Sequence, residues 1–264
     1  MKKYLPSLVT CLNMMSGVCA CILALWGYFW QAYCFILAGT VFDLCDGALA
    51  RLLKATSPMG KELDSLSDLV TFGLAPALML FTWYFKINCE GMAGNPLAFV
   101  PLLLVAFSAL RLARFNTGSD ESTSFKGLPT PACAMIAASV AAYGHCCTLA
   151  GVQSASAAGA TGAVAAAQSV ILSLLLSSWF IPVLAAVLCV LLVSRIPMFS
   201  LKSKLGAKHY ILAGGALILV AVIAFVAPRG ISFIGYAALF TLLLFCVYVL
   251  IALISPGRKS PMNN

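Results

Sequence analysis

Long apolar runs constrain this chain more than any other feature of its sequence. Runs of about 20 residues are long enough to cross the hydrocarbon core of a bilayer as a helix, and they follow one another along most of the chain. They lie at about 6–28, 31–53, 66–86, 96–116, 130–150, 170–194, 210–228 and 231–254. The sequence therefore predicts an all-α, polytopic integral membrane protein with about eight transmembrane helices.

Composition agrees with this prediction. Hydrophobic residues make up 62% of the 264 residues and charged residues only 9%, whereas a soluble domain has roughly 45–50% apolar and about 25% charged residues. A soluble enzyme, a nucleic-acid-binding protein and a secreted disulfide scaffold are therefore excluded for the chain as a whole. We expect the net charge of +8 to face lipid headgroups rather than nucleic acid.

The basic residues predict the orientation of the helices, because Lys and Arg are retained in cytoplasmic loops. If the N-terminus is cytoplasmic, fourteen of the sixteen Lys and Arg residues lie on that side, and only Lys86 and Arg229 are external. We therefore expect a protein of the cytoplasmic membrane with both termini, and its active site, on the cytoplasmic side.

The acidic residues are concentrated in one short stretch, which includes four aspartates at the edges of two spans. Asp43 and Asp46 lie three residues apart at the end of the second span, and Asp64 and Asp68 lie four apart at the start of the third. Each pair projects from one helical face. A carboxylate at membrane depth costs on the order of 2.5–3.5 kcal/mol, so four that face one another need compensation. Hard divalent cations with oxygen ligands supply it, and two such ions would suit phosphoryl transfer.

Small and polar residues accompany these acids. Gly47 and Ala50 share the face of the first acidic pair and leave space for a ligand group, although the alternative is that they only allow close helix packing. Arg51 can bind a phosphate through two N–H donors. Ser57 followed by Pro58 is typical of a helix start, so we expect the third helix to be capped by Ser57.

Together these residues spell a motif with fixed spacing. The motif reads Asp43-x-x-Asp46-Gly47-x-x-Ala50-Arg51, eight residues, Gly60, three residues, Asp64, three residues, Asp68. At each of these positions it resembles the signature of the CDP-alcohol phosphatidyltransferases. Segments 62–76, 109–116 and 125–131 further resemble the membrane-embedded phosphatidylserine synthases.

The resemblance covers about residues 4–200 and implies both an architecture and an activity. It implies a catalytic core at 1–200 with the family's six helices, and two additional helices with a short cytoplasmic tail at 201–264. It also implies transfer of the phosphatidyl group of CDP-diacylglycerol to the hydroxyl of L-serine with release of CMP, two magnesium or manganese ions, and a homodimer among membrane lipids.

Two alternatives stay open. Other acceptors of the family, such as glycerol 3-phosphate or inositol phosphate, would use the same motif. A divalent-metal or small-solute transporter would spread its acids over several helices and show an internal inverted repeat, and the sequence shows neither.

The resemblance also implies residue roles. Asp43 and Asp64 correspond to aspartates that bridge two metal ions, Asp46 completes one ion, and Asp68 contacts the other and acts as general base. The first span begins with Pro6-Ser7 where the family often has Pro-Asn. The residues expected to hold the CDP-diacylglycerol are Gly47, Ala50, Arg51, Ser57 and Gly60, with Ser7 and Asn13 on the first span.

The carboxylate of serine needs a cation near the metals. Arg111, Arg114, Asn116 and Lys126 are the candidates, and the polar stretch 117–124 that joins Arg114 to Lys126 favours those two. The alternative is that these cations anchor the protein by extending to lipid headgroups.

Overall fold

The computed structural model of the chain describes residues 5–53, 57–88, 95–117, 125–156, 177–194, 197–198 and 241. The elements are α1 (Leu5–Leu25), α2 (Phe29–Leu52), α3 (Pro58–Asp68), the π-helix η2 (Leu69–Leu74), α4 (Ala75–Asn88), the 3-10 helix η3 (Pro96–Leu102), α5 (Leu103–Thr117), β1 (Phe125–Lys126), α6 (Thr130–Ser156), α8 (Phe180–Val193) and β2 (Pro197–Met198). Among the described residues, four helical stretches are long and apolar enough to cross a membrane: α1, α2, the continuous rod α3–η2–α4, and η3–α5. The prediction of an all-α membrane protein is confirmed.

The helix boundaries agree with the sequence prediction in most places. The third helix begins at Pro58 rather than near 66. Its first turns are polar, so they were not part of the apolar run from which the helix was predicted. Ser57 caps it as expected, since the Ser57 Oγ accepts a hydrogen bond from the Gly60 N–H at 3.0 Å. The seventh and eighth predicted helices, 210–228 and 231–254, lie outside the described residues except for Thr241, so the count of eight stays a prediction.

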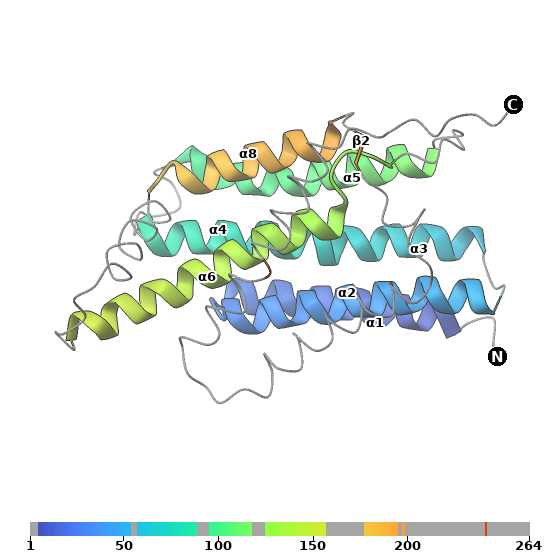
Figure 1. Cartoon of the computed structure of the whole chain (residues 1–264), viewed down its shortest axis with the longest axis horizontal. Coiled ribbons are helices and arrows are strands. Elements are labelled where there is room, and N and C mark those ends of the chain that lie inside the picture. The colour runs from blue at the N-terminus through green and yellow to red at the C-terminus, as the bar shows by residue number, and fades with distance from the viewer. Residues whose placement is uncertain are drawn as a thin grey trace, which may run out of the picture.

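The described helices form layers around the rod α3–η2–α4 (Figure 1). The hairpin of α1 and α2 lies along one side of the rod and the pair of α5 and α8 along the other, while α6 crosses it obliquely. The start of α1, the end of α2, the start of α3 and the end of α5 lie at one end of the bundle. This arrangement brings the two acidic helix ends together.

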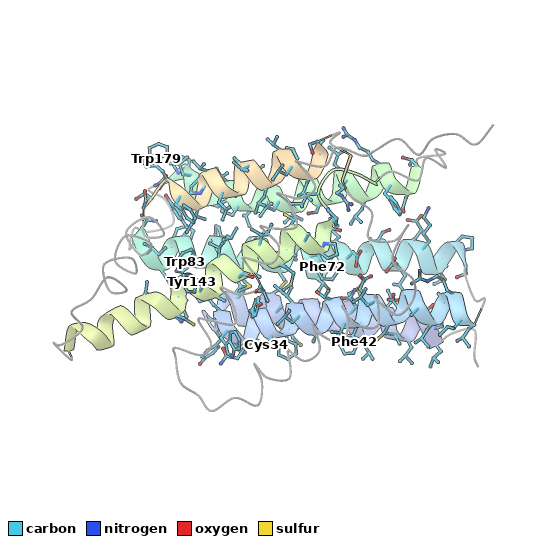
Figure 2. All side chains as sticks on the ribbon, in the orientation of Figure 1. Cys34, Phe42, Phe72, Trp83, Tyr143 and Trp179 are labelled. Carbon is cyan, nitrogen blue, oxygen red and sulfur yellow. The ribbon has the colours of Figure 1, made fainter. Side chains whose placement is uncertain are left out.

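The core is sealed by large side chains that meet small ones. Trp83 of α4 is 1% exposed, and a Cβ built on Gly144 of α6 would lie 2.0 Å from its Cζ2 atom. Trp83 and the neighbouring Tyr143 mark this crossing in Figure 2. Only glycine at position 144 allows the indole ring this close, so the crossing of α4 and α6 has little freedom.

A second close junction joins α1 and α2 to η2 through Thr71. A Cβ on Gly17 would lie 2.4 Å from the Thr71 Oγ1, and one on Gly39 would lie 2.5 Å from the Thr71 Cγ2. The Thr71 hydroxyl donates to the Asn13 carbonyl at 3.0 Å. Because glycines permit this approach, α1, α2 and η2 meet in the turn that directly follows Asp68.

The only strands among the described residues are two short ones near the end of α8. Phe125 pairs with Met198 and Lys126 with Pro197 in an antiparallel ladder. Gly127 has a φ of 82°, and a Cβ there would lie 2.7 Å from the Leu192 carbonyl oxygen. The segment that leads into α6 is thereby held against the end of α8.

Candidate functional site

Three of the motif aspartates form one cluster. Asp43 of α2 and Asp64 and Asp68 of α3 each offer a carboxylate oxygen, and these oxygens all lie within 4.8 Å of one another. All three side chains are partly buried. The prediction that two antiparallel helices would bring their carboxylates together is therefore confirmed for these three residues.

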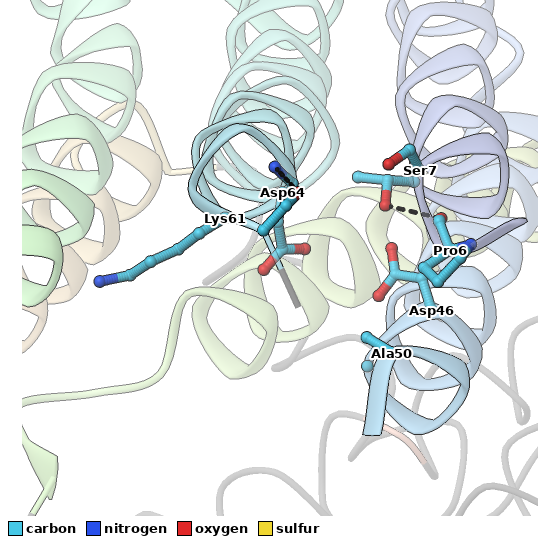
Figure 3. Close-up of a pocket in the computed structure, with 10 residues that line it drawn as sticks. Pro6, Ser7, Asp46, Ala50, Lys61 and Asp64 are labelled. Atoms are coloured by element: carbon cyan, nitrogen blue, oxygen red, sulfur yellow. Dashed lines mark hydrogen bonds between the residues drawn. The ribbon is translucent and has the colours of Figure 1, made fainter. Parts of the chain in front are cut away.

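The fourth aspartate, Asp46, lies beside this cluster rather than within it. Its side chain is 5% exposed, and its Oδ2 atom has no hydrogen-bond partner in the described part of the chain. Figure 3 shows Asp46 and Asp64 facing one another across a pocket. A buried carboxylate oxygen without a donor fits a cation, because burying a polar atom without a partner costs free energy.

A cavity of about 190 Å³ opens next to the aspartates, between the ends of α1, α2 and α3 (Figure 3). It is lined by Pro6, Ser7, Thr10, Asp46, Gly47, Ala50, Ser57, Gly60, Lys61 and Asp64. Five of the seven residues predicted to hold the CDP-diacylglycerol are in this lining, on three separate helices. The cavity is thus a suitable place for a ligand that also touches the aspartates.

Gly47 lies in this wall without a packing partner among the described residues. A Cβ built on it would meet none of their heavy atoms within 4 Å. Close helix packing, the alternative explanation for this glycine, would have placed a neighbouring helix there, as it does at Gly17 and Gly39. The empty space above Gly47 therefore favours a ligand group.

The other two predicted ligand residues lie outside the lining. The Arg51 side chain is exposed, and its Nε donates to the Gly47 carbonyl of its own helix at 2.9 Å. Asn13 is fully buried, and its Nδ2 donates to the Asp68 Oδ1 at 3.5 Å. Asn13 therefore lies against the aspartate cluster and not in the cavity.

The predicted acceptor residues are dispersed over the neighbouring helices. The partly buried Arg111 donates from Nη1 to the Thr130 Oγ1 at 3.3 Å, and Asn116 donates from Nδ2 to the Ser65 Oγ at 2.9 Å. Arg114 is exposed. The backbone of Lys126 lies in β1, against β2.

Sequence reasoning missed Pro6, Thr10 and Lys61 as cavity residues. A signal for the first two was available, because the buried positions of α1 include Pro6, Thr10, Asn13 and Gly17, which follow helical spacing. Polar residues on that stripe of an otherwise apolar helix mark its interior face. For Lys61 the sequence gives no such signal, and Figure 3 shows its side chain extending away from Asp64.

The donors at this site are suited to one class of metal. The cluster offers only carboxylate oxygens, and oxygen ligands are preferred by magnesium, manganese and calcium, whereas zinc favours His and Cys. The cluster and the unpartnered Asp46 oxygen together fit a site for hard divalent cations.

Comparisons with known proteins point to the same chemistry. A family model described as CDP-alcohol phosphatidyltransferase matches residues 3–171. Three similar proteins carry the name CDP-diacylglycerol–serine O-phosphatidyltransferase. The one from Helicobacter pylori strain J99 is 37% identical over 134 residues, which cover 50% of this chain and 54% of that protein. The Bacillus subtilis protein is 35% identical over 133 residues, which cover 49% of this chain and 70% of that protein. The Saccharomyces cerevisiae protein is 39% identical over 144 residues, which cover 48% of this chain and 50% of that protein. The chain thus spans about half the length of the Helicobacter and yeast relatives.

Proposed function

This chain belongs to the CDP-alcohol phosphatidyltransferase family, and from that membership we propose that it transfers the phosphatidyl group of CDP-diacylglycerol to the hydroxyl of L-serine. The observation that carries the proposal is the cluster of Asp43, Asp64 and Asp68 beside a cavity with a bare glycine in its wall. The names of the relatives from Helicobacter, Bacillus and yeast support serine as the acceptor.

In the proposed reaction the serine hydroxyl oxygen attacks the phosphorus that carries the diacylglycerol. The bond from that phosphorus to the oxygen shared with the cytidylate breaks, and CMP leaves with the bonding electron pair. The hydroxyl proton goes to the Asp68 carboxylate, which is the general base of the proposal. The products are phosphatidylserine and CMP.

The motif aspartates would hold two divalent cations, magnesium or manganese. Asp43 and Asp64 would be shared between the ions, with Asp46 and Asp68 each completing one. The 4.8 Å grouping of three carboxylates and the unpartnered oxygen of Asp46 support this assignment. When bound, the cations would neutralise the charge of the pyrophosphate.

The CDP moiety is proposed to occupy the cavity. Gly47 and Ala50 would let it approach the backbone of α2, and Ser57 and Gly60 would meet it from the start of α3. Ser7, on α1, stands in the same lining and supplies a hydroxyl. The acyl chains can then stay in the lipid beside α1 and α2, whose outer faces carry exposed apolar side chains.

The acceptor side is inferred from how α5 lies against α3 and η2. The Asn116 amide contacts Ser65, and a Cβ on Gly73 would lie 3.3 Å from the Ser108 Cβ. Residue numbers on α5 therefore decrease along the contact as those on α3 and η2 increase, so α5 is antiparallel to both. In this register, residues 111–114 lie at the level of Asp68.

Within that level, the register favours Arg111 as the residue that binds the serine carboxylate. Leu112 shares the α3-facing side of α5 with Ser108 and Asn116. Arg111 directly precedes Leu112, just as Asp68 directly precedes Leu69 on the facing helix. In two antiparallel helices, residues that directly precede the contact positions lie on the same side of the contact. Arg114 projects away from α3 and is exposed, which suits an anchor at the headgroups.

Three broader assignments accompany this proposal. The catalytic core is proposed to be 1–200, with 201–264 as an addition, and the family match to 3–171 supports the first part. A location in the cytoplasmic membrane with the site facing the cytoplasm is supported by the basic residues. Lys61 lines the cavity, and Arg111 and Arg114 lie in the last part of α5, whose end lies at the same end of the bundle as the start of α3 (Figure 1). The homodimer stays a prediction.

The test is CMP release by the purified protein in detergent, with CDP-diacylglycerol and either manganese or magnesium. Serine, glycerol 3-phosphate, inositol phosphate and no acceptor are compared, each with and without EDTA. Serine-dependent release that EDTA abolishes supports the proposal. Release with another alcohol would overturn serine as the acceptor, and no release with any of them would favour the transporter alternative.

A further inference from the structure

Asn13 is a polar side chain buried in an apolar helix, and its surroundings single it out. It is 0% exposed, and the acceptor of its amide N–H is the Asp68 Oδ1 at 3.5 Å. Burying an amide without good partners costs free energy. Among the described residues its Oδ1 has no hydrogen-bond partner, so the contact with Asp68 is what the side chain gains at this position.

The backbone around Asn13 is fixed by hydrogen bonds from the helix that carries Asp68. The Thr71 hydroxyl donates to the Asn13 carbonyl at 3.0 Å, and the Ser67 hydroxyl donates to the Thr10 carbonyl at 3.1 Å. Ser67 directly precedes Asp68, and Thr71 follows it by three positions in η2. The position of Asn13 along α1 is therefore set relative to that carboxylate.

The side chain of Asn13 is also confined from the opposite side. A Cβ on Gly39 of α2 would lie 2.9 Å from the Asn13 Oδ1, so the glycine leaves just enough room for the amide. The π-helix η2 begins at Leu69, immediately after Asp68, and such segments recur at functional sites. One glycine, two hydroxyl groups and an irregular helical turn thus confine this single amide.

We infer that Asn13 is a positioning residue that fixes the orientation of the Asp68 carboxylate, and that it does not contact the CDP moiety. An N–H donor on one carboxylate oxygen limits rotation of the group. It also supplies positive charge density to a carboxylate that faces those of Asp43 and Asp64. The catalytic part of this inference rests on the proposed function, whereas the metal-binding part does not.

The test compares Asn13→Leu with the matched control Ser16→Ala. Leucine keeps the approximate size of the side chain and removes the donor. Ser16 lies one turn further along the same helix, is 5% exposed, and donates to the Phe35 carbonyl of α2. Both substitutions remove a hydrogen bond made by a buried side chain of α1, but only one of these bonds reaches an aspartate.

Two readouts separate positioning from general destabilisation. Binding of Mn²⁺ alone, followed by electron paramagnetic resonance, is expected to weaken about 10- to 100-fold in Asn13→Leu, as when the partner of a metal ligand is removed. The kcat for CMP release should fall about 10- to 100-fold, the usual effect of losing a hydrogen bond to a charged group. With Mn²⁺ kept at saturating concentration, the KM for CDP-diacylglycerol should stay within about twofold, since hydrogen-bond loss at a site that does not touch the nucleotide removes no ligand contact. Ser16→Ala should leave all three values near wild type.

Each alternative result has a definite meaning. Wild-type Mn²⁺ affinity and kcat in Asn13→Leu would overturn the inference, and so would a raised KM for CDP-diacylglycerol with unchanged kcat, which would place Asn13 at the nucleotide. If Asn13→Leu does not fold, Asn13→Ser replaces it, because serine can bond to its own helix but cannot reach Asp68. An absence of turnover in the wild type would count against the proposed function alone, since the Mn²⁺ titration still tests Asn13.

Discussion

Replacing Gly47 with alanine is expected to stabilise the protein and at the same time weaken its use of CDP-diacylglycerol. The two effects have opposite signs because the added methyl group favours the folded protein but competes with the ligand for space. A Cβ at this position touches no heavy atom within 4 Å in the part of the chain that the structure describes, so we expect the fold to accept it without strain. The same methyl group projects into the cavity where the CDP moiety is proposed to lie.

The magnitudes follow from these surroundings. Alanine in a helix interior is more favourable than glycine by about 1 kcal/mol, and no clash offsets this gain. On the ligand side, inserting a methyl group into a filled site costs about 1–3 kcal/mol, which corresponds to an increase of about 5- to 150-fold in the KM for CDP-diacylglycerol. The KM for serine should change little, because the acceptor is proposed to bind near α5.

The assay combines thermal unfolding in detergent with CMP release at varied CDP-diacylglycerol. Gly17→Ala serves as the contrast, because its Cβ would lie 2.8 Å from the Thr71 Cα, a backbone atom that cannot move aside. That variant should unfold at a lower temperature than wild type. A Gly47→Ala protein whose KM for CDP-diacylglycerol stays within about twofold of wild type would refute the ligand role of this glycine.

Four further substitutions test other parts of the site and of the fold. Asp68→Asn should lower kcat about 10²- to 10⁴-fold, the usual contribution of a general base, while equilibrium binding of CDP-diacylglycerol largely persists; near wild-type turnover would rule out Asp68 as the base. Arg111→Ala should raise the KM for serine about tenfold or more, as expected for a lost charged hydrogen bond, and Arg114→Ala should leave it nearly unchanged; equal effects of the two would contradict the helix register. Tyr33→Phe should cost about 1–2 kcal/mol of stability, because the buried Tyr33 hydroxyl lies 2.6 Å from the Thr241 Oγ1, and kcat should not change; unaltered thermal unfolding would show that this hydrogen bond contributes nothing.

The parts of the site that the sequence predicted are those that depend on local geometry. The spacing of Asp64 and Asp68 puts both on one face of a helix, and the Ser57–Pro58 pair starts that helix regardless of what packs against it. The meeting of this helix with the end of α2 follows from the short connection between them. Such features require only helical periodicity and one tight turn.

The parts that the sequence did not predict depend on contacts between distant segments. Nothing in the residues Leu69–Leu74 distinguishes a π-helix from an α-helix, and the contacts of Thr71 with Gly17 and Gly39 join segments that are far apart in the sequence. The contact of Asn13 with Asp68 likewise joins positions 55 residues apart. The register of α5, which separates Arg111 from Arg114, depends on the contacts of Asn116 with Ser65 and of Ser108 with Gly73.

One helix, α1, links the two halves of the proposed site. Ser7 and Thr10 line the cavity, and Asn13, about one turn beyond, contacts Asp68. Because the Ser67 hydroxyl bonds to the Thr10 carbonyl between these points, α1 cannot shift along α3 without disturbing both the cavity wall and the carboxylate. The distance between the proposed nucleotide site and the proposed general base is therefore set by the rise of a single helix. This accounts for the polar residues that an otherwise apolar membrane helix retains on its inner face.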